Sequence, residues 1–453
     1  MKIAVIGGGP IGMEAALYGA CAGFDVRLYE RGRLGENVRQ WGHVSVFTDW
    51  RRNRSPLAAR LLTERGATLP SPDTNSTGDE LADYVVRLAG LEPLRGRIAP
   101  QTEVLSIARE ACLKSDFIDD ARRLERPFRL LVRAGRLEKI IPADAVIDAT
   151  GVYATPNWIG NGGMPSVGEM GLRARIDYAL PDVLGRERAR FAGRHTLIVG
   201  SGHSAASTLR DIGALIEEFP ATRMTWVVRR DVPPHGFPYS IVPNDSSPHR
   251  EELHRRANEL SRDLHVDFCP RHVVDALSFD GQKWRVALDS GGQKRDIECD
   301  NVVAHTGFRP DETLWQELSV RVHSATQGPL VLAQALVNQN HRGGVGLSTG
   351  YAERPAKKSA ENASQSTLES SEAAPVDRWK FSPDDPALLE TGEANFFVIG
   401  IKSYGRDAGF LMHNGFRQVR DVYKLLSHNL DLDLYQGELD VKAPETAAVK
   451  TEA

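Results

Sequence analysis

The sequence contains few cysteines, and none of them are paired in a way that suggests chemistry. Among 453 residues there are four, Cys21, Cys112, Cys269 and Cys299, with no C-x-x-C pair. This spacing argues against a structural zinc site or a dithiol redox centre and favours a reducing, cytoplasmic environment. The 13 histidines show no metal-ligand spacing, so no metal is expected.

Long apolar runs and a strong charge excess are also absent. No run approaches the ~20 residues that a membrane-spanning helix needs. The net charge of −4 gives no support for a nucleic-acid or anionic-membrane partner. The apolar N-terminus is interrupted by glycines and follows no basic region, so we interpret it as a first strand and not as a signal peptide. The length predicts two or three domains.

The first thirty residues form a complete dinucleotide-binding pattern. An apolar run at 2–6, typical of a buried parallel strand, leads into Gly7, Gly9 and Gly12 in the spacing G-x-G-x-x-G. The first glycine allows a tight turn, the second lets backbone approach a pyrophosphate, and the third lets the following helix pack closely. That helix offers free N–H groups to phosphate. Glu30, after a second predicted strand, is placed to bind a ribose. The alternative is a glycine-rich turn without a ligand.

A second pattern of the same kind lies near residue 200. An apolar strand precedes Gly200, Gly202 and Ala205, which fit G-x-G-x-x-A, and a helix follows. The next predicted strand ends in Arg229 and Arg230 where an acid would favour NAD. Arginine favours the 2′-phosphate of NADP, so NADPH is the expected nucleotide. The alternative is that both arginines are simply exposed at a strand end.

The two patterns belong to an internal repeat. Residues 144–151 form an apolar strand ending in Thr-Gly, and residues 300–307 have the same form. Each copy contains a fingerprint, an excursion and such a strand, and the second copy begins before the first is complete. We therefore predict an α/β fold with two Rossmann-like dinucleotide-binding domains, the second inserted in the first. The expected parts are 1–160, 161–308 and 309–435.

Other stretches give weaker expectations. Residues 31–56 lack clear periodicity and predict a long ordered loop. Residues 351–376, dominated by Ser, Ala, Glu and Lys, predict a disordered insertion, and 436–453 a disordered tail. A helix should open at Thr77 and another should run from about Phe410 to Leu426. Further strands are predicted at 103–107, 128–132, 145–148, 266–268, 284–288, 301–304 and 394–400.

The order of these motifs resembles the two-dinucleotide-binding-domain flavoproteins, the group of flavin-containing monooxygenases and thioredoxin reductases. In that group the first fingerprint binds FAD and the inserted one binds NAD(P)H. The resemblance covers most of residues 1–435. It implies an NADPH-dependent FAD oxidoreductase acting on a small-molecule substrate, without nucleic acid, and is compatible with a homodimer.

The resemblance also implies roles for individual residues. The expected FAD contacts are Gly7, Gly9, Pro10, Ile11, Gly12, Glu30, Arg31, Val104 through its backbone, Thr150, Gly151, Gly400 and Ile401. The expected NADPH contacts are Gly200, Ser201, Gly202, His203, Ser204, Ala205, Arg229 and Arg230. For His203, packing or capping is the alternative. The candidate catalytic residues, in the loop expected nearest the flavin, are Lys402, Tyr404 and Asp407.

The chain departs from the group's pattern in informative ways. Many relatives have Gly-Asp where this chain has Gly400-Ile401, so the usual ribitol-binding acid is missing and Asp407 is a candidate replacement. The F-x-G-x-x-x-H motif of flavin-containing monooxygenases is absent ahead of the second fingerprint. In contrast, the stretch from Ala149 to Tyr153, followed by Pro156, is more similar to the monooxygenases than to the reductases.

Three functions follow as alternatives. The first is an NADPH-dependent monooxygenase that oxygenates a soft nitrogen or sulfur nucleophile through a flavin hydroperoxide. The second is an NADPH-dependent flavin reductase or dehydrogenase that passes electrons to a quinone or another acceptor. The third is a nucleotide-binding protein without turnover. In the first two the cofactor supplies the chemistry and the protein positions it, which agrees with the lack of a Ser/His/Asp or paired-carboxylate signature.

Overall fold

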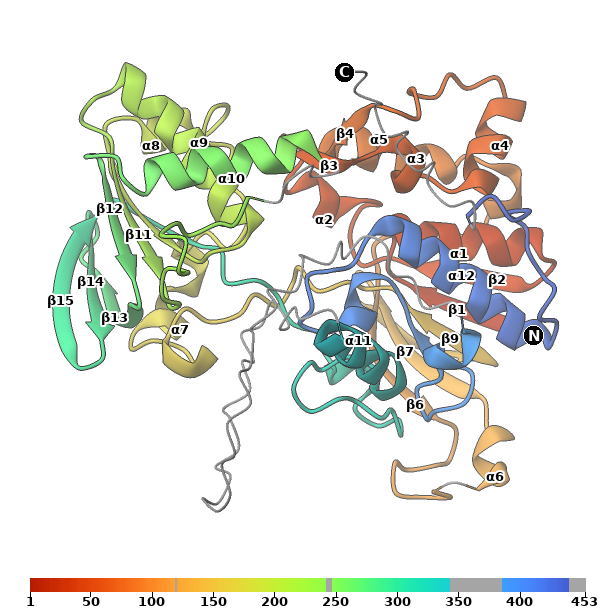
Figure 1. Ribbon diagram of the computed structural model, residues 1–453. Helices are drawn as coiled ribbons and strands as arrows, with labels where there is room; N and C mark the ends of the chain where they lie inside the picture. The colour runs from red at the N-terminus through yellow and green to blue at the C-terminus, as the bar shows by residue number, and fades with distance from the viewer. Residues whose placement is uncertain (119, 242–246, 343–384, 440–453) are drawn as a thin grey trace, which may run out of the picture.

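The chain folds into two lobes, seen side by side in the ribbon view of the computed structural model (Figure 1). The structure describes residues 1–118, 120–241, 247–342 and 385–439. One lobe contains both the first and the last described segments. The other is formed by the middle of the chain. In the described ranges no helix is long and apolar enough to cross a membrane.

The first lobe is built on a five-stranded parallel sheet in the order β17-β9-β1-β2-β5. Its strands are β1 (Lys2–Ile6), β2 (Asp25–Tyr29), β5 (Ile98–Ala99), β9 (Ala145–Asp148) and β17 (Phe396–Val398). The last strand returns after the whole second lobe and pairs with β9, Phe397 lying opposite Ile147. The second domain is therefore inserted in the first, as predicted.

The second lobe repeats this plan with a four-stranded parallel sheet in the order β12-β11-β10-β16. Its strands are β10 (His195–Val199), β11 (Arg223–Val228), β12 (Val266–Pro270) and β16 (Asn301–Ala304). The central strands of both sheets are continuous apolar runs because parallel sheets are covered on both faces.

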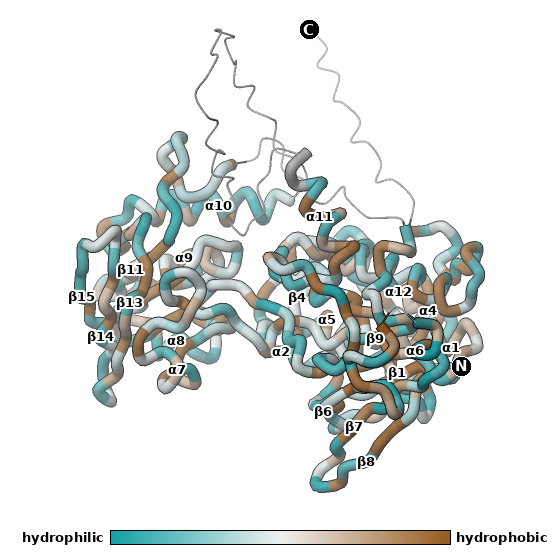
Figure 2. Tube along the Cα trace, turned by 90° about the horizontal axis from the view of Figure 1, so that it is seen from below, coloured by the Kyte–Doolittle hydropathy of each residue, from teal (hydrophilic) through white to brown (hydrophobic). Residues whose placement is uncertain are grey.

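Each lobe also carries a three-stranded antiparallel sheet, which extends the repeat. These strands are β6 (Thr102–Arg109), β7 (Phe128–Ala134) and β8 (Leu137–Ala143), then β13 (Val273–Phe279), β14 (Trp284–Ser290) and β15 (Gln293–Cys299). Both have a register shift in the first strand, after Val104 and after Val274. The β6–β8 sheet projects from its lobe in Figure 2.

Helices cover the parallel sheets. The longer ones are α1 (Pro10–Cys21), α4 (Pro56–Glu64), α5 (Gly78–Leu88), α9 (His203–Glu218), α10 (Pro248–Leu260), α11 (Leu330–Arg342) and α12 (Met412–Ser427). Short turns of helix are α6 (Ala121–Leu124), α7 (Glu169–Leu172), α8 (Arg188–Phe191), η1 (Glu92–Leu94), η2 (Asn161–Gly163), η3 (Arg173–Arg175), η4 (Thr313–Trp315), η6 (Pro386–Leu389) and η7 (Gly400–Tyr404).

Two of these helices show why the sequence forms them. Thr77 caps α5 in a reciprocal capping box with Glu80, so this helix opens as predicted. Helix α12 packs on α1, where the hydroxyl of Tyr423 donates to the carbonyl of Ala15 at 2.8 Å. A side chain at Gly19 would collide with that ring, so the glycine permits the close approach.

The expectation of a long loop at 31–56 was wrong. The segment contains α2 (Glu36–Arg39), β3 (Ser45–Asp49) and α3 (Trp50–Asn53), and β3 pairs with β4 (Asn75–Thr77). The side chain of Trp50 is buried in the hydrophobic core of the first lobe. Each element is too short to show a period, and the pairing partner is about thirty residues away, so no local pattern indicated them.

The structure differs from the sequence-based prediction at two further places, the edge strands of the antiparallel sheets and the C-terminal tail. Strands β8 and β15 were not predicted, because almost all their side chains are exposed and the apolar alternation is missing. The predicted tail begins too early, since Leu439 is buried and its carbonyl accepts from Arg417. The predicted insertion at 351–376 and residues 440–453 lie outside the described residues.

A buried carboxylate ties the first antiparallel sheet to the returning segment of the chain. Glu393 accepts hydrogen bonds from Arg109 at 2.9 Å, from Arg123 at 2.8 Å and from the backbone of Ser319 at 2.8 Å. Burial raises the pKa of this carboxyl, but the bonds from Arg123 and Ser319 outweigh it and the pKa is lowered. Glu393 is therefore ionised in the folded protein at neutral pH.

We expect Glu393→Ala to lower the free energy of unfolding by about 3–5 kcal/mol, because two buried guanidinium groups lose their partner. Urea denaturation of the apoprotein, followed by tryptophan fluorescence, measures it. The matched control is Asp275→Ala, which breaks the exposed Lys294–Asp275 pair and should cost about 1 kcal/mol or less. Equal losses in both variants would contradict the role of the buried network.

Candidate dinucleotide-binding sites

The first glycine loop connects β1 to α1, and its three glycines differ in what surrounds them. Gly7 has φ +104°, and a Cβ there would lie 2.6 Å from the carbonyl oxygen of Ala149. A Cβ on Gly12 would lie 1.9 Å from the carbonyl oxygen of Gly7. A Cβ on Gly9 would meet no protein atom within 4 Å. Two glycines are thus required by the fold, while Gly9 faces open space that can receive a ligand.

The N-terminus of α1 is exposed to that same space. Gly9 is the N-cap and makes no side-chain cap, Pro10 is the first helical residue, and the first turn holds no acid. The N–H groups of this turn, with the positive end of the helix dipole, suit a phosphate. The residues present therefore fit the pyrophosphate of a dinucleotide.

Glu30 lies beside the loop at the end of β2. Its carboxylate accepts from the backbone N–H of Gly8 at 2.5 Å and of Gly32 at 2.7 Å. A carboxylate has about four lone-pair positions, so capacity remains for ribose hydroxyls. The backbone carbonyl of Glu30 accepts a hydrogen bond from the backbone N–H of Thr102, the first residue of β6. Val104, another predicted FAD contact, lies two residues further along the same strand. Arg31 follows as an exposed side chain.

The closing turn meets the glycine loop at the carboxyl edge of the sheet. Gly400 has φ +71°, and a Cβ there would lie 3.5 Å from the Ile11 side chain. Gly151, also at φ +71°, would place a Cβ 3.8 Å from the Ile401 side chain. Gln418 of α12 accepts from the N–H of Gly400 at 2.8 Å. The structure therefore brings Ile11, Gly151, Gly400 and Ile401 together, and their contact with FAD stays a prediction.

A buried charge cluster lies at this edge, and the sequence did not indicate it. Asp148, at the end of β9, accepts from the backbone N–H of Thr150 at 3.0 Å and from its hydroxyl at 2.7 Å. It also accepts from Trp315 Nε1 at 2.9 Å and from Lys402 Nζ at 2.6 Å. Neither Asp148 nor Lys402 exposes more than 1% of its side chain.

The candidate catalytic residues are thus largely internal. Lys402 is held in the charge cluster, and the hydroxyl of Tyr404 accepts from Asn414 at 3.1 Å. Burial raises the pKa of Tyr404, so the phenol stays protonated. Asp407 is also buried and accepts from the N–H of Gly409 at 2.7 Å. These contacts favour positioning roles over direct contact with a substrate.

The second glycine loop, between β10 and α9, divides its roles in the same way. Gly200 has φ +131°, and a Cβ there would lie 2.2 Å from the carbonyl oxygen of His305. A Cβ on Gly202 would meet nothing within 4 Å. Gly202 is the N-cap of α9 and makes no side-chain cap. The buried Ala205 packs where a third glycine would stand, so this site also fits a pyrophosphate.

The side chains on the outer side of the second loop are exposed, and a buried histidine lies behind the loop. Ser201, His203, Arg229 and Arg230 are exposed, both arginines following the carboxyl end of β11, and Ser204 is half-buried. His305 is hydrogen-bonded to Thr208 at 2.7 Å, and burial lowers the pKa of His305 to about 3. The His305 ring is therefore neutral and structural.

The first lobe touches the second loop through an aromatic stack that the sequence did not reveal. The His203 ring lies parallel to that of His254 at 5.1 Å and 5.3 Å from Phe47 of β3. The hydroxyl of Ser247, just before α10, donates to the carbonyl of Phe47 at 3.4 Å. In Figure 1 the end of α10 accordingly reaches β3. Packing accounts for at least part of the role of His203.

The four thiols are free and lie outside both loops and the closing turn. Cys21 ends α1 on the side away from its glycines, Cys112 contacts Arg123, and Cys269 and Cys299 are in β12 and β15. Burial raises the pKa of Cys21 and Cys269 to about 11 and that of Cys299 to about 12. These three are thiols, not thiolates, at neutral pH.

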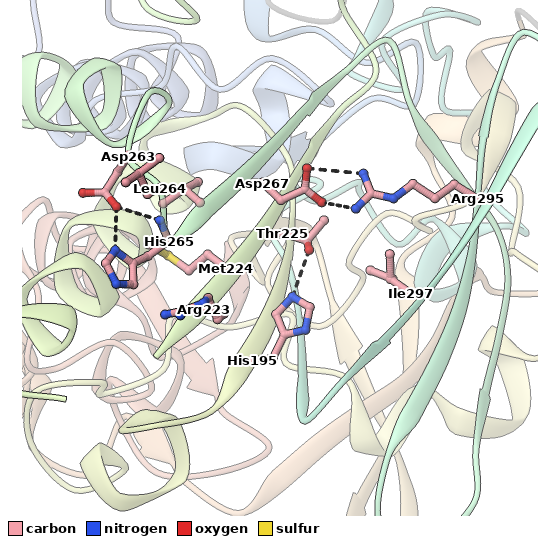
Figure 3. A pocket seen from close by; sticks show the side chains of 11 residues that line it. His195, Arg223, Met224, Thr225, Asp263, Leu264, His265, Asp267, Arg295 and Ile297 are labelled. Carbon is pink, nitrogen blue, oxygen red and sulfur yellow. Dashed lines mark hydrogen bonds and ion pairs between the residues drawn. The ribbon is translucent and has the colours of Figure 1, made fainter. Parts of the chain in front are cut away.

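A further pocket lies at the opposite edge of the second sheet (Figure 3). It is lined by the amino ends of β10, β11 and β12, whereas the glycine loop is at the carboxyl end of β10. In its lining Asp267 pairs with Arg295, and Asp263 lies 2.9 Å from Nδ1 of His265. Within the described residues no group of three or more His, Cys, Asp or Glu side chains is placed to hold a metal ion.

Comparison with known families agrees with this geometry. The sequence profile of the pyridine nucleotide-disulphide oxidoreductases matches residues 1–330, over two thirds of the chain. The chain belongs to this family. Membership confirms the predicted type of protein, an FAD- and NAD(P)-dependent oxidoreductase, and its predicted cofactors, FAD and NADPH. A search of curated proteins found no match.

Several solved structures share the fold at low sequence identity. The bacillithiol disulfide reductase Bdr of Bacillus cereus has a TM-score of 0.62 at 15% identity, covering 94% of this chain and 100% of that one. The thioredoxin reductase of T. acidophilum scores 0.52 at 15%, covering 93% and 97%. DfoA of Erwinia amylovora, a cadaverine monooxygenase bound to FAD, scores 0.55 at 13%, covering 93% and 94%.

We expect Gly9→Val to abolish FAD retention while leaving the apoprotein folded, because the added side chain occupies ligand space and its Cβ meets no protein atom within 4 Å. Gly12→Val is the matched contrast, since its side chain collides with the Gly7 carbonyl and should destabilise the apoprotein itself. Flavin absorbance after gel filtration and thermal unfolding of the apoproteins separate the two effects. Full FAD retention by Gly9→Val would show that the loop is not the pyrophosphate site.

Proposed function

We propose that this oxidoreductase is an NADPH-dependent monooxygenase acting on a small soft nucleophile, with nitrogen or sulfur as the oxygenated atom. The observation that carries the proposal is the placement of the four free thiols outside both cofactor loops and the closing turn. Disulfide reduction by relay needs a reactive dithiol beside the flavin. Without one, electrons must pass from the flavin directly to oxygen or to another small acceptor.

The residues that the chain supplies act by binding and by excluding water. FAD, when bound, supplies hydride acceptance and reactivity with oxygen. Around it, the first glycine loop and Glu30 would hold the adenosine and pyrophosphate, and the second loop would hold NADPH. The closing turn at Gly400 is buried and braced by Gln418, which would limit water near the flavin.

A second function, electron transfer from NADPH to a quinone or another acceptor, is supported by a different observation. The fold is also that of the disulfide reductase Bdr, with a TM-score of 0.62, so this architecture serves reductases as well. A likeness at 15% identity supports the architecture alone. The two functions differ in what oxidises the reduced flavin, which an experiment can separate.

We expect NADPH to bleach the flavin without oxygen. On mixing with oxygen, a nucleophile such as a primary amine or a thioether should lower the hydrogen peroxide released per NADPH. Stopped-flow absorbance, a peroxide assay and mass spectrometry of the product measure these steps. The control is the same mixture without nucleophile. Complete conversion of oxygen to peroxide with every nucleophile, together with faster reoxidation by a quinone, would favour the reductase. Failure of NADPH to bleach bound flavin would exclude both.

The preference for NADPH should depend on Arg229 and Arg230, which are exposed at the end of β11 where the adenosine 2′-phosphate would lie. A charge-assisted hydrogen bond contributes ~1.5–3 kcal/mol, equivalent to roughly ten- to a hundred-fold in nucleotide preference. Anaerobic flavin reduction by NADPH and NADH in Arg229→Ala and Arg230→Ala measures it. Arg285→Ala, which removes an exposed arginine of β14, is the control. An unchanged preference for NADPH over NADH in both arginine variants would show that other residues determine it.

A further inference from the structure

The side chain of Lys402 is unusual because lysine side chains normally reach solvent. It is 1% exposed, and its ammonium lies 2.6 Å from Asp148 Oδ2 and 3.0 Å from Thr150 Oγ1. Almost no lysine is fully buried unless it is paired. Here the pairing is complete enough that Lys402 is not available to a substrate.

The cluster around this ammonium joins three separate parts of the first domain. Asp148 and Thr150 come from the end of β9, Lys402 from the closing turn η7, and Trp315 from η4, after the chain has returned from the second lobe. The Trp315 indole N–H donates to the same Asp148 oxygen as Lys402 does. Asp148 is therefore the common acceptor that fixes these segments relative to one another.

Stability by itself is a weak explanation for such a pair. Removing two charges from water costs free energy comparable to what their attraction returns, and neutral replacements of a buried pair are often tolerated. What a neutral pair cannot reproduce is the orientation of the Thr150 hydroxyl. That hydroxyl accepts from Lys402, which has only donors, and so must donate to Asp148.

Fixing Thr150 also fixes the backbone that follows it. Gly151 comes next at φ +71° and lies against Ile401, the residue before Lys402. Lys402 thus holds both sides of the contact between the β9 end and the closing turn. These are the segments that face the predicted path of FAD beside the first glycine loop.

We propose that Lys402 is a positioning residue for FAD, acting through Asp148 and Thr150 to hold residues 150–151 and 400–401 in the arrangement that receives the cofactor. The proposal rests on FAD binding at the first glycine loop. It is independent of whether oxygen or another acceptor oxidises the flavin.

The test compares Lys402→Met with the neutral double variant Asp148→Asn/Lys402→Met. The single variant leaves a buried carboxylate unpaired, so its apoprotein should unfold at a lower temperature and its Kd for FAD should rise at least about tenfold. The double variant leaves no unpaired charge, and its one amide oxygen can still accept from Thr150, while its NH2 group replaces the oxygen that faced Trp315 and Lys402. It should recover part of the apoprotein stability that the single variant loses, but not the affinity for FAD or the wild-type flavin absorbance band.

The measurements are thermal unfolding of the apoproteins, FAD titration by fluorescence quenching, and absorbance of the bound flavin. Lys294→Met, which removes an exposed lysine of β15, should leave all three unchanged. Wild-type FAD affinity and an unaltered absorbance band in either Lys402 variant would overturn the proposal and leave the cluster purely structural. If the wild-type protein transfers no oxygen to any nucleophile, the monooxygenase function is contradicted, but this inference about Lys402 is unaffected.

Discussion

The close approach of helix to strand at the two glycine loops is the constraint on which both domains depend. In the first loop α1 comes so near the end of β1 that no side chain fits at Gly12, and the turn at Gly7 needs a positive φ. In the second loop Gly200 has φ +131° and lies against the carbonyl of His305, as Gly7 lies against that of Ala149. This contact aims each helix N-terminus at the carboxyl edge of its sheet. One glycine in each loop, Gly9 or Gly202, then remains free of protein contact, which is where a pyrophosphate fits.

The remainder of the first domain closes around that edge from distant parts of the chain. The strand β17 and the turn η7 arrive some 390 residues after β1, and Asp148 binds the turn through Lys402. Glu393, just before β17, binds Arg109 of β6 in the first antiparallel sheet and Arg123 of α6. Two buried carboxylates thus connect the start and the end of an interrupted domain. Each lies where an unpaired charge would be costly, so the closing segment has one favourable position.

The two lobes use the same plan for different tasks. Both have a parallel sheet, a glycine loop and an antiparallel sheet with a register shift in its first strand. The acid Glu30 follows β2 in the first lobe, whereas Arg229 and Arg230 follow β11 in the second. The four cysteines are free thiols that lie outside both glycine loops and the closing turn. The fold therefore provides two dinucleotide-binding loops. It does not by itself determine which molecule accepts electrons from the flavin.

Much of this arrangement was predictable because local patterns encode it. Glycine spacing, apolar strands and the nested repeat predicted two Rossmann-like domains, one inserted in the other. They also placed Gly7, Gly9, Gly200 and Gly202 at strand-to-helix turns and Gly12 in the first turn of α1. Those features depend on residues adjacent in sequence, where each position has a distinct steric requirement. The capping box at Thr77 is of the same kind.

Other features depended on tertiary structure alone. A lysine in a polar turn gives no sign that Asp148, 254 positions earlier, will bury it. Strand β3 exists because β4 pairs with it, and the edge strands β8 and β15 carry no apolar alternation. The stack of His203 between Phe47 and His254 joins two domains whose contact no local pattern records. The sequence by itself determined where backbone must approach backbone, because only glycine fits at such positions and its spacing can be recognised in the sequence. Only the folded chain decided which charges are buried, because burial is a property of what packs around a residue.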